Sequence, residues 1–205
     1  MRISTTIVES YRLYRTESWM SEEAMVASAT GEFEWTEKMA LGAAFEEAVD
    51  HCLAPHEGEV VEMAGECGSV SLTWSGVRAV QNGLPADRVP QVKVVSRIAG
   101  HDLVGKADYL SGAEVRDLKT TTKTINIDKY VRSLQWQSYL LLFGGSRFWY
   151  DVAYLSEKGG VWDLRDFQQF DCRPYPGMRE YLEGWVAEYA SWYKELGLED
   201  RAVSV

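Results

Sequence analysis

The stretch that decides the fold of this chain is "HDLVGKADYLSGAEVRDLKTTT", residues 101–122. Apolar and β-branched residues run through it on both sides of Ser111-Gly112, a pair that favours a tight turn. The stretch therefore predicts two successive strands, and "QVKVVSRIAG" (91–100) predicts a third strand before them. Asp117 and Lys119 stand two apart in the last strand, so their side chains point to the same face.

A second acid is expected near this face. Asp108 lies nine residues before Asp117, and pairing through the turn would bring the two carboxylates close together. Converging carboxylates repel, which raises one pKa unless they share a cation. Mg²⁺ takes oxygen ligands, and Lys119 beside it could orient or deprotonate a water molecule or stabilise charge on a phosphate. The set suits metal-assisted hydrolysis of a phosphodiester. The alternative is a turn aspartate and an exposed ion pair.

Helical patterns flank these strands. Residues 36–54 carry apolar residues at spacings of six, four and four (Met39, Phe45, Val49, Leu53), which predicts a helix. We also expect helices over 4–16, 127–144 and 175–197 and two strands over 147–170, while 59–68 and 72–84 could each be helical. The order predicts one α/β domain over residues 1–205, with its core motifs over about 36–155 and an aromatic-rich C-terminal helix.

Composition narrows the class of protein. The chain has 46% hydrophobic and 25% charged residues, as soluble globular proteins do. It shows no apolar run of about 20 residues and no signal-peptide pattern, so a cytoplasmic protein without a membrane partner is expected. The net charge is −10, but residues 90–135 hold more Lys and Arg than Asp and Glu.

Cysteine usage argues against common metal and disulfide frameworks. The three cysteines are far apart and form no CxxC pair, which disfavours a four-cysteine zinc or iron–sulfur site. His51 and His56 lie near Cys52, but their spacing fits no common zinc finger.

Two of the predicted helices offer further polar groups. Glu46 and Asp50 are four apart and share a helix face, where like charges are mildly unfavourable. An acid there could complete a metal site or belong to an ordinary solvated face. Gln135 and Tyr139 share a face beside an apolar stripe, where a glutamine needs a partner; capping a neighbouring backbone is the simplest one.

Taken in order, these segments resemble the PD-(D/E)XK nuclease superfamily, most closely its RecB-like, phage-type exonuclease branch. The matching motifs span about residues 3–143 and are "ISTTIVESYRLY", "LGAAFEEAVD", Gly105 to Asp108, "DLKT" at 117–120, and Gln135 to Tyr139. The resemblance implies a restriction-endonuclease-like α/β core, with a central mixed sheet of about five strands flanked by α-helices.

The resemblance also implies a metal site. Asp108 and Asp117 would bind Mg²⁺ or Mn²⁺ together with the backbone carbonyl of Leu118, and Lys119 would be the catalytic lysine. Glu46 stands where many relatives have histidine. It is the first choice for the helix ligand, and Glu47 and Asp50 are reserves.

Nucleic-acid contacts are implied as well. Gln135, which also belongs to the expected catalytic set, and Tyr139 would contact DNA or brace the site. Lys123 and Arg132 would contact phosphates. The many aromatic residues over 148–193 could stack on bases, but at this spacing they are more typical of a core.

The expected function is therefore a metal-dependent DNA exonuclease that processes DNA ends in recombination or repair. The expected setting is the cytoplasm of a prokaryotic cell or phage-infected host, with a single-strand-annealing recombinase as a candidate partner and the oligomeric state left open. No nucleotide-binding loop occurs, so a helicase fusion is not expected. The alternatives are an endonuclease of the same superfamily, restriction-like or junction-resolving, and a non-catalytic nucleic-acid-binding subunit that keeps the fold.

Overall fold

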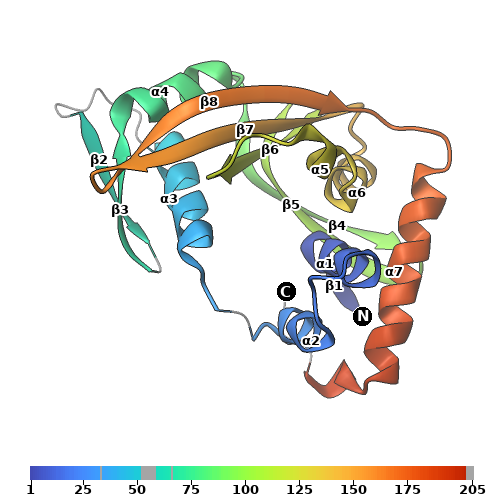
Figure 1. Ribbon diagram of the computed structural model, residues 1–205. Coiled ribbons are helices and arrows are strands. Elements are labelled where there is room, and N and C mark those ends of the chain that lie inside the picture. The colour runs from blue at the N-terminus through green and yellow to red at the C-terminus, as the bar shows by residue number, and fades with distance from the viewer. Residues whose placement is uncertain (33, 52–58, 66, 202–205) are drawn as a thin grey trace.

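The computed structural model describes residues 1–32, 34–51, 59–65 and 67–201 (Figure 1). Its strands are β1 (Arg2–Ser4), β2 (Val60–Gly65), β3 (Gly68–Thr73), β4 (Val89–Ile98), β5 (His101–Ser111), β6 (Glu114–Thr121), β7 (Arg147–Lys158) and β8 (Val161–Cys172). Its helices are α1 (Thr5–Thr16), α2 (Glu22–Thr30), α3 (Glu37–His51), α4 (Trp74–Gly83), α5 (Ile127–Val131), α6 (Leu134–Phe143) and α7 (Met178–Glu195), followed by a 3₁₀ turn, η1 (Leu198–Arg201).

The described strands form one mixed sheet. Its order is β1-β5-β6-β7-β8-β3-β2, and β4 also pairs with β5. β6 and β7 are parallel, whereas β4–β5, β5–β6 and β7–β8 are antiparallel. The predicted fold class, a central mixed sheet flanked by helices, is confirmed. The expected number of about five strands is wrong because the sheet has eight: the three-residue β1 and the β2–β3 hairpin were not anticipated.

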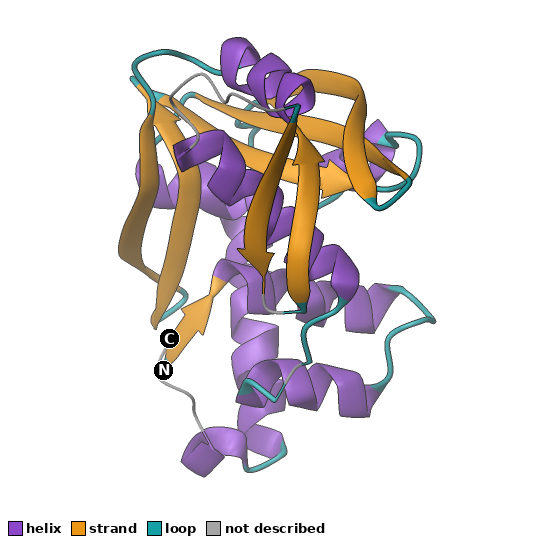
Figure 2. Ribbon diagram, turned by 90° about the vertical axis from the view of Figure 1, so that its left-hand side faces the viewer, coloured by secondary structure: helices purple, strands orange, loops and turns teal. Residues whose placement is uncertain are grey.

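Helices lie on both sides of this curved sheet (Figures 1 and 2). α1, α6 and α7 contribute to one apolar cluster, and α3 and α4 contribute to a second. Alternation along β6 explains the division, because Val115 belongs to the first cluster and Leu118 to the second. Among the described helices, none has the length and apolar character needed to cross a membrane.

Of the two segments that could each be helical, the first forms strands instead: β2 and β3 pair from Val60–Thr73 to Gly65–Gly68. On the exposed face of this hairpin, Glu62 accepts hydrogen bonds from the hydroxyls of Ser69 and Ser71. Of the segment 72–84, residues 74–83 form α4.

The helix expected over 127–144 is split into α5 and α6. Ser133 separates them, because its side-chain oxygen accepts a hydrogen bond from the backbone N–H of Gln135 and thereby starts a new helix. In α3, Phe45 and Val49 are buried as expected, but Met39 is 42% exposed. Leu53, Cys52 and His56 lie outside the described residues.

A buried ion pair joins the two central parallel strands. Arg116 of β6 donates two hydrogen bonds to Asp151 of β7, from Nε to Oδ2 at 2.9 Å and from Nη2 to Oδ1 at 2.7 Å. The guanidinium carbon lies 5.0 Å from the Trp149 ring centroid, and Gln169 donates a further hydrogen bond to Asp151. A two-point contact of this kind fixes the alignment of both strands.

We expect Asp151→Ala to lower the free energy of unfolding by about 3–5 kcal/mol, because it leaves a buried guanidinium without its counter-charge. Urea unfolding measures this change. Asp166→Ala on the neighbouring β8 is the matched control: Asp166 is exposed, so this variant should stay within about 0.5 kcal/mol of the parent protein. Equal stability of the two variants would contradict the structural role given to the buried pair.

Candidate active site

A cleft opens beside β5, the strand that pairs with β1, β4 and β6. β4 pairs with one edge of β5 from His101 to Leu110. The opposite edge is shared by β1, at residues 102–104, and β6, at residues 109–111. Residues 105–108 pair with neither, so β1 and β6 diverge from β5 at this point. The resulting cleft has a volume of about 400 Å³ and is lined by residues of β1, α1, β4, β5, β6 and α6.

Both strand carboxylates expected from the sequence line this cleft. Asp108 accepts a hydrogen bond at Oδ2 from the backbone N–H of Leu118, at 2.8 Å, and so reaches from β5 to β6. Asp117 is 1% exposed, and its Oδ2 lies 2.6 Å from the Nζ atom of Lys119. The structure therefore brings Asp108, Asp117 and Lys119 together.

The environment disfavours the charged form of both acids. Burial raises the pKa of Asp108 well above its ordinary value, and the charge of Asp117 raises it further. Burial also raises the pKa of Asp117, although Lys119 acts in the opposite direction. For Lys119, burial favours the neutral amine, but the charges of Asp117 and Asp108 prevail and raise its pKa above the ordinary value. The lysine is therefore an ammonium ion at neutral pH.

Among the three helix acids, Glu46 faces this group. It is half-buried, and its Oε1 accepts a hydrogen bond from Nε2 of Gln91 in β4. Burial raises the pKa of Glu46, and the charges of Asp117 and Lys119 act on it in opposite directions. By contrast, Glu47 is exposed beside His51, and Asp50 accepts a hydrogen bond from the Tyr109 hydroxyl at 2.8 Å.

Helix α3 reaches the sheet at a glycine. A Cβ atom on Gly42 would lie 3.0 Å from Oγ1 of Thr120 in β6, so the absence of a side chain permits close packing there. Glu46 follows one turn later on α3. The close contact thus holds Glu46 near the strand that carries Asp117 and Lys119.

Helix α6 braces the cleft from the other side. Gln135 donates from Nε2 to Oδ1 of Asp117 at 3.0 Å, and the Tyr139 hydroxyl donates to the carbonyl oxygen of Lys106 at 2.8 Å. That carbonyl belongs to the part of β5 that pairs with neither β1 nor β6. The partner of Gln135 is thus a site carboxylate rather than a neighbouring backbone group. DNA contact by Gln135 and Tyr139 stays a prediction.

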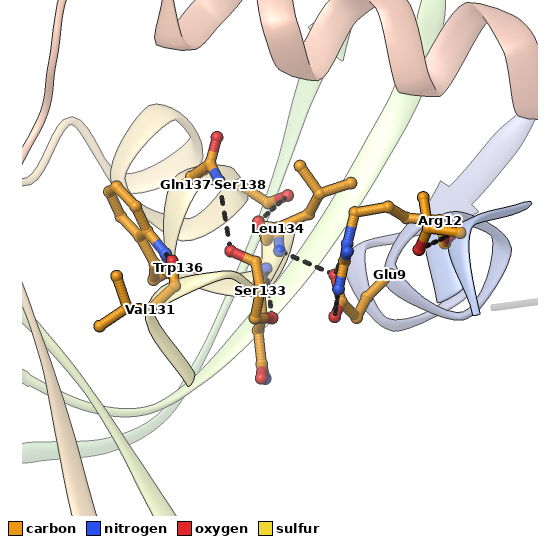
Figure 3. Close-up of polar contacts among 10 residues, drawn as sticks. Glu9, Arg12, Val131, Ser133, Leu134, Trp136, Gln137 and Ser138 are labelled. Atoms are coloured by element: carbon orange, nitrogen blue, oxygen red, sulfur yellow. Dashed lines mark hydrogen bonds and ion pairs between the residues drawn. The ribbon is translucent and has the colours of Figure 1, made fainter. Parts of the chain in front are cut away.

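The start of α6 is fixed by polar contacts with α1 (Figure 3). Glu9 accepts a hydrogen bond from the backbone N–H of Leu134 at 2.7 Å and pairs with Arg12 at 2.8 Å. On the other side, the indole N–H of Trp136 donates to the carbonyl oxygen of Val131 at 2.9 Å. These contacts set the position of the helix turn that carries Gln135.

Two further lysines line the cleft beside Lys119. Lys93 of β4 and Lys106 of β5 are register partners that both line it. Lys123 and Arg132, expected from the sequence to contact DNA, are exposed on the segment that follows β6. Because two like charges directly opposite each other on a sheet are unfavourable, the lysine pair favours an anionic occupant.

Two residues of the site were missed. Lys106 could have been found, because the turn at Gly100 places it opposite Lys93 in the predicted hairpin. Gln91 gave no recognisable signal, since its role depends on a backbone conformation that sequence pattern does not encode.

The acids do not form a ready-made metal centre. Within residues 1–32, 34–51, 59–65 and 67–201, no group of three or more His, Cys, Asp or Glu side chains could hold a metal ion as placed. Internal donors engage the carboxylates instead: the Leu118 N–H for Asp108, Lys119 and Gln135 for Asp117, and Gln91 for Glu46.

No protein-family model matches the chain, and no curated protein matches its sequence. Solved structures match it in three dimensions. An alkaline exonuclease from Laribacter hongkongensis is 11% identical with a TM-score of 0.51, and the match covers 97% of this chain and 93% of that one. Its complex with dAMP is 10% identical with a TM-score of 0.52, and the match covers 95% of this chain and 90% of that one. A protein from Eubacterium rectale that is assigned as an exonuclease is 12% identical with a TM-score of 0.52, and the match covers 93% of this chain and 79% of that one.

This chain has the fold of these exonuclease structures. At such identities the likeness concerns the fold alone, and it confirms the α/β architecture expected from the sequence. It does not extend to the roles of individual residues, which rest on the geometry of the cleft.

The contact between α6 and β5 generates a prediction. A Cβ atom on Gly105 would lie 2.6 Å from Cδ1 of Leu142 and 3.0 Å from the Tyr139 ring. We expect Gly105→Ala to lower the free energy of unfolding by about 1–3 kcal/mol, because it overpacks this contact. Thermal and urea unfolding measure the effect.

Gly184→Ala in α7 is the matched control for this change. An added Cβ atom there meets nothing within 4 Å, so the better helix propensity of alanine should raise stability by about 0.5–1 kcal/mol. If Gly105→Ala were also stabilising, close packing of α6 on β5 would not be the reason for the glycine.

Proposed function

We propose that the chain is a single-domain, metal-dependent DNA exonuclease of the PD-(D/E)XK type that hydrolyses phosphodiesters at DNA ends. The observation that carries the proposal is the convergence of Asp108 and Asp117 on one cleft beside Lys119. The fold shared with two exonuclease structures supports it. The dAMP complex of the Laribacter hongkongensis enzyme supports a nucleic-acid substrate.

The donor chemistry of the cleft fits a divalent cation. Asp108 and Asp117 both line the cleft, and the charge of Asp117 raises the cost of ionising Asp108. Oδ2 of Asp117 is buried and makes no hydrogen bond of good geometry beyond its ion pair. Carboxylate oxygens are the ligands that Mg²⁺ and Mn²⁺ accept. These two residues would hold the ion, with Glu46 and the Leu118 carbonyl as further oxygen donors.

In the proposed hydrolysis, the metal ion and the side chains of the cleft would have different roles. A bound Mg²⁺ or Mn²⁺ would supply Lewis acidity toward the phosphate and toward the attacking water. Lys119, held as an ammonium ion by the neighbouring carboxylates, would stabilise negative charge that develops on the phosphate. Gln135 would keep the Asp117 carboxylate oriented through its hydrogen bond to Oδ1.

The basic residues around the cleft would bind the DNA backbone. Lys93 and Lys106 line the cleft itself, and Lys123 and Arg132 would extend the contact along the exposed segment after β6. This local arrangement offsets the overall net charge of −10, which would otherwise oppose binding of a polyanion. End processing for recombination, with a single-strand-annealing recombinase as partner, remains a prediction from the family resemblance.

The proposal is tested with end-labelled linear duplex and single-stranded DNA, in Mg²⁺ and in EDTA. We expect release of label in Mg²⁺ only, and no digestion of covalently closed circular DNA, since that substrate has no ends. Asp117→Asn should lower the rate by about 100-fold or more, because it removes a ligand charge from the site. Asp166→Asn, on the exposed part of β8, should behave as the parent protein does. Digestion of the circular substrate would favour an endonuclease, and equal activity of Asp117→Asn would exclude the site.

The helix ligand is tested by a pair of neighbouring variants. We expect Glu46→Gln to raise the Mg²⁺ concentration needed for half-maximal cleavage by about 10-fold or more, because it removes a charged oxygen donor. Glu47→Gln should leave that concentration unchanged, since Glu47 faces solvent beside His51. Cleavage rates across a Mg²⁺ titration measure both. The opposite ranking would transfer the ligand role to Glu47.

A further inference from the structure

Gln91, near the start of strand β4, has an unusual backbone conformation. Its φ angle is +55°, in the left-handed region that side chains other than glycine rarely adopt. The ladder between β4 and β5 pairs Pro90 with Tyr109 and Val92 with Ala107, but it omits the pair between them, Gln91 and Asp108. The backbone is therefore turned at the position opposite a site carboxylate.

The turned residue contacts the site through its side chain. The Nε2 atom of Gln91 donates a hydrogen bond to Oε1 of Glu46, which lies 45 residues earlier in the chain on α3. Gln91 thus links β4 to the helix acid on which the charges of Asp117 and Lys119 act. An amide donor orients a carboxylate without adding a positive charge to the cleft.

A turn does not account for this conformation. Ala99 is the other non-glycine residue with positive φ among the described residues, at +47°. It forms, with Gly100, the two-residue connection between β4 and β5, where positive φ is what a tight hairpin requires. Gln91 lies inside a strand, and glutamine is not a residue favoured in the left-handed region. Backbone strain of this kind gathers at functional sites.

We propose that Gln91 is a positioning residue that fixes the Glu46 carboxylate for binding of a divalent cation. The inference rests on the proposed metal site, and it makes Gln91 a determinant of metal affinity rather than a group that touches the substrate. Hydrogen-bond partners of metal ligands commonly change metal affinity 10–100-fold when they are removed. The left-handed backbone of Gln91 is unfavourable by itself, but it directs the side-chain amide toward Glu46.

The test measures Mn²⁺ binding by titration calorimetry and thermal unfolding without metal. We expect Gln91→Gly to weaken Mn²⁺ binding about 10-fold or more. Its Tm should stay close to that of the parent, since glycine relieves the left-handed backbone while the hydrogen bond is lost. Gln91→Asn, which tolerates the conformation but is one methylene shorter, should also bind Mn²⁺ more weakly. Ala99→Gly relieves the same kind of strain away from the site and should leave Mn²⁺ affinity unchanged.

A double-mutant comparison identifies the route of the effect. If Gln91 acts through Glu46, then Gln91→Gly should cause no further loss of Mn²⁺ affinity when added to Glu46→Gln. Parent-like Mn²⁺ affinity in Gln91→Gly, with affinity still lost in Asp117→Asn, would overturn this inference and leave the proposed function standing. An equal loss of affinity in Ala99→Gly, or a large fall in the Tm of Gln91→Gly, would also overturn it. A parent protein that neither binds Mn²⁺ nor cleaves DNA would remove both proposals.

Discussion

The convergence of two carboxylates on one cleft is the constraint around which the site is arranged. Burial raises the pKa of both Asp108 and Asp117, and the charge of Asp117 raises the pKa of Asp108 further. Every unit of such a shift corresponds to about 1.4 kcal/mol of preference for the neutral form. The protein offsets this cost with donors aimed at each carboxylate, from the Leu118 N–H and from Gln135 and Lys119. The acids are thus held in place by donors from β6 and α6.

The divergence of β1 and β6 along one edge of β5 makes this arrangement possible. Asp108 reaches the backbone N–H of Leu118 because the β5–β6 ladder ends at the pair of Tyr109 and Arg116. A continued ladder would engage strand backbone groups with each other instead of with side chains. On the open side, the Tyr139 hydroxyl donates a hydrogen bond to the carbonyl oxygen of Lys106, where β5 pairs with neither β1 nor β6. The gap between β1 and β6 is therefore filled by side chains that contact the backbone of β5 and β6.

Sequence patterns predicted the parts of this structure that depend on local chemistry. The turn residues Gly100 and Ser111-Gly112 and the residues between them predicted β4, β5 and β6, and alternation put Asp117 and Lys119 on one face. Residues 59–68 were ambiguous because a short apolar run suits a helix or a strand, and the serine–glutamate contacts across the hairpin decide it. The break at Ser133 depends on one side-chain cap. The contact of Gln91 with Glu46 could not be predicted from sequence patterns, because the two residues are 45 positions apart on different elements.

Charge balance explains why Lys119 alone does not complete the site. With Asp108, Asp117 and Glu46 ionised, the ammonium ion of Lys119 matches only one of their three charges, although Lys93 and Lys106 also line the cleft. Burial is the first cause of the raised pKa of each acid, and neighbouring carboxylates add to it: Asp50 and Asp117 for Glu46, Asp117 and Glu46 for Asp108, and Asp151 for Asp117. In the proposed nuclease, a divalent cation would supply positive charge between these carboxylates, and its oxygen-ligand chemistry suits the groups at hand. Lys119, 2.6 Å from Asp117, would then be placed to meet the further negative charge of a phosphate.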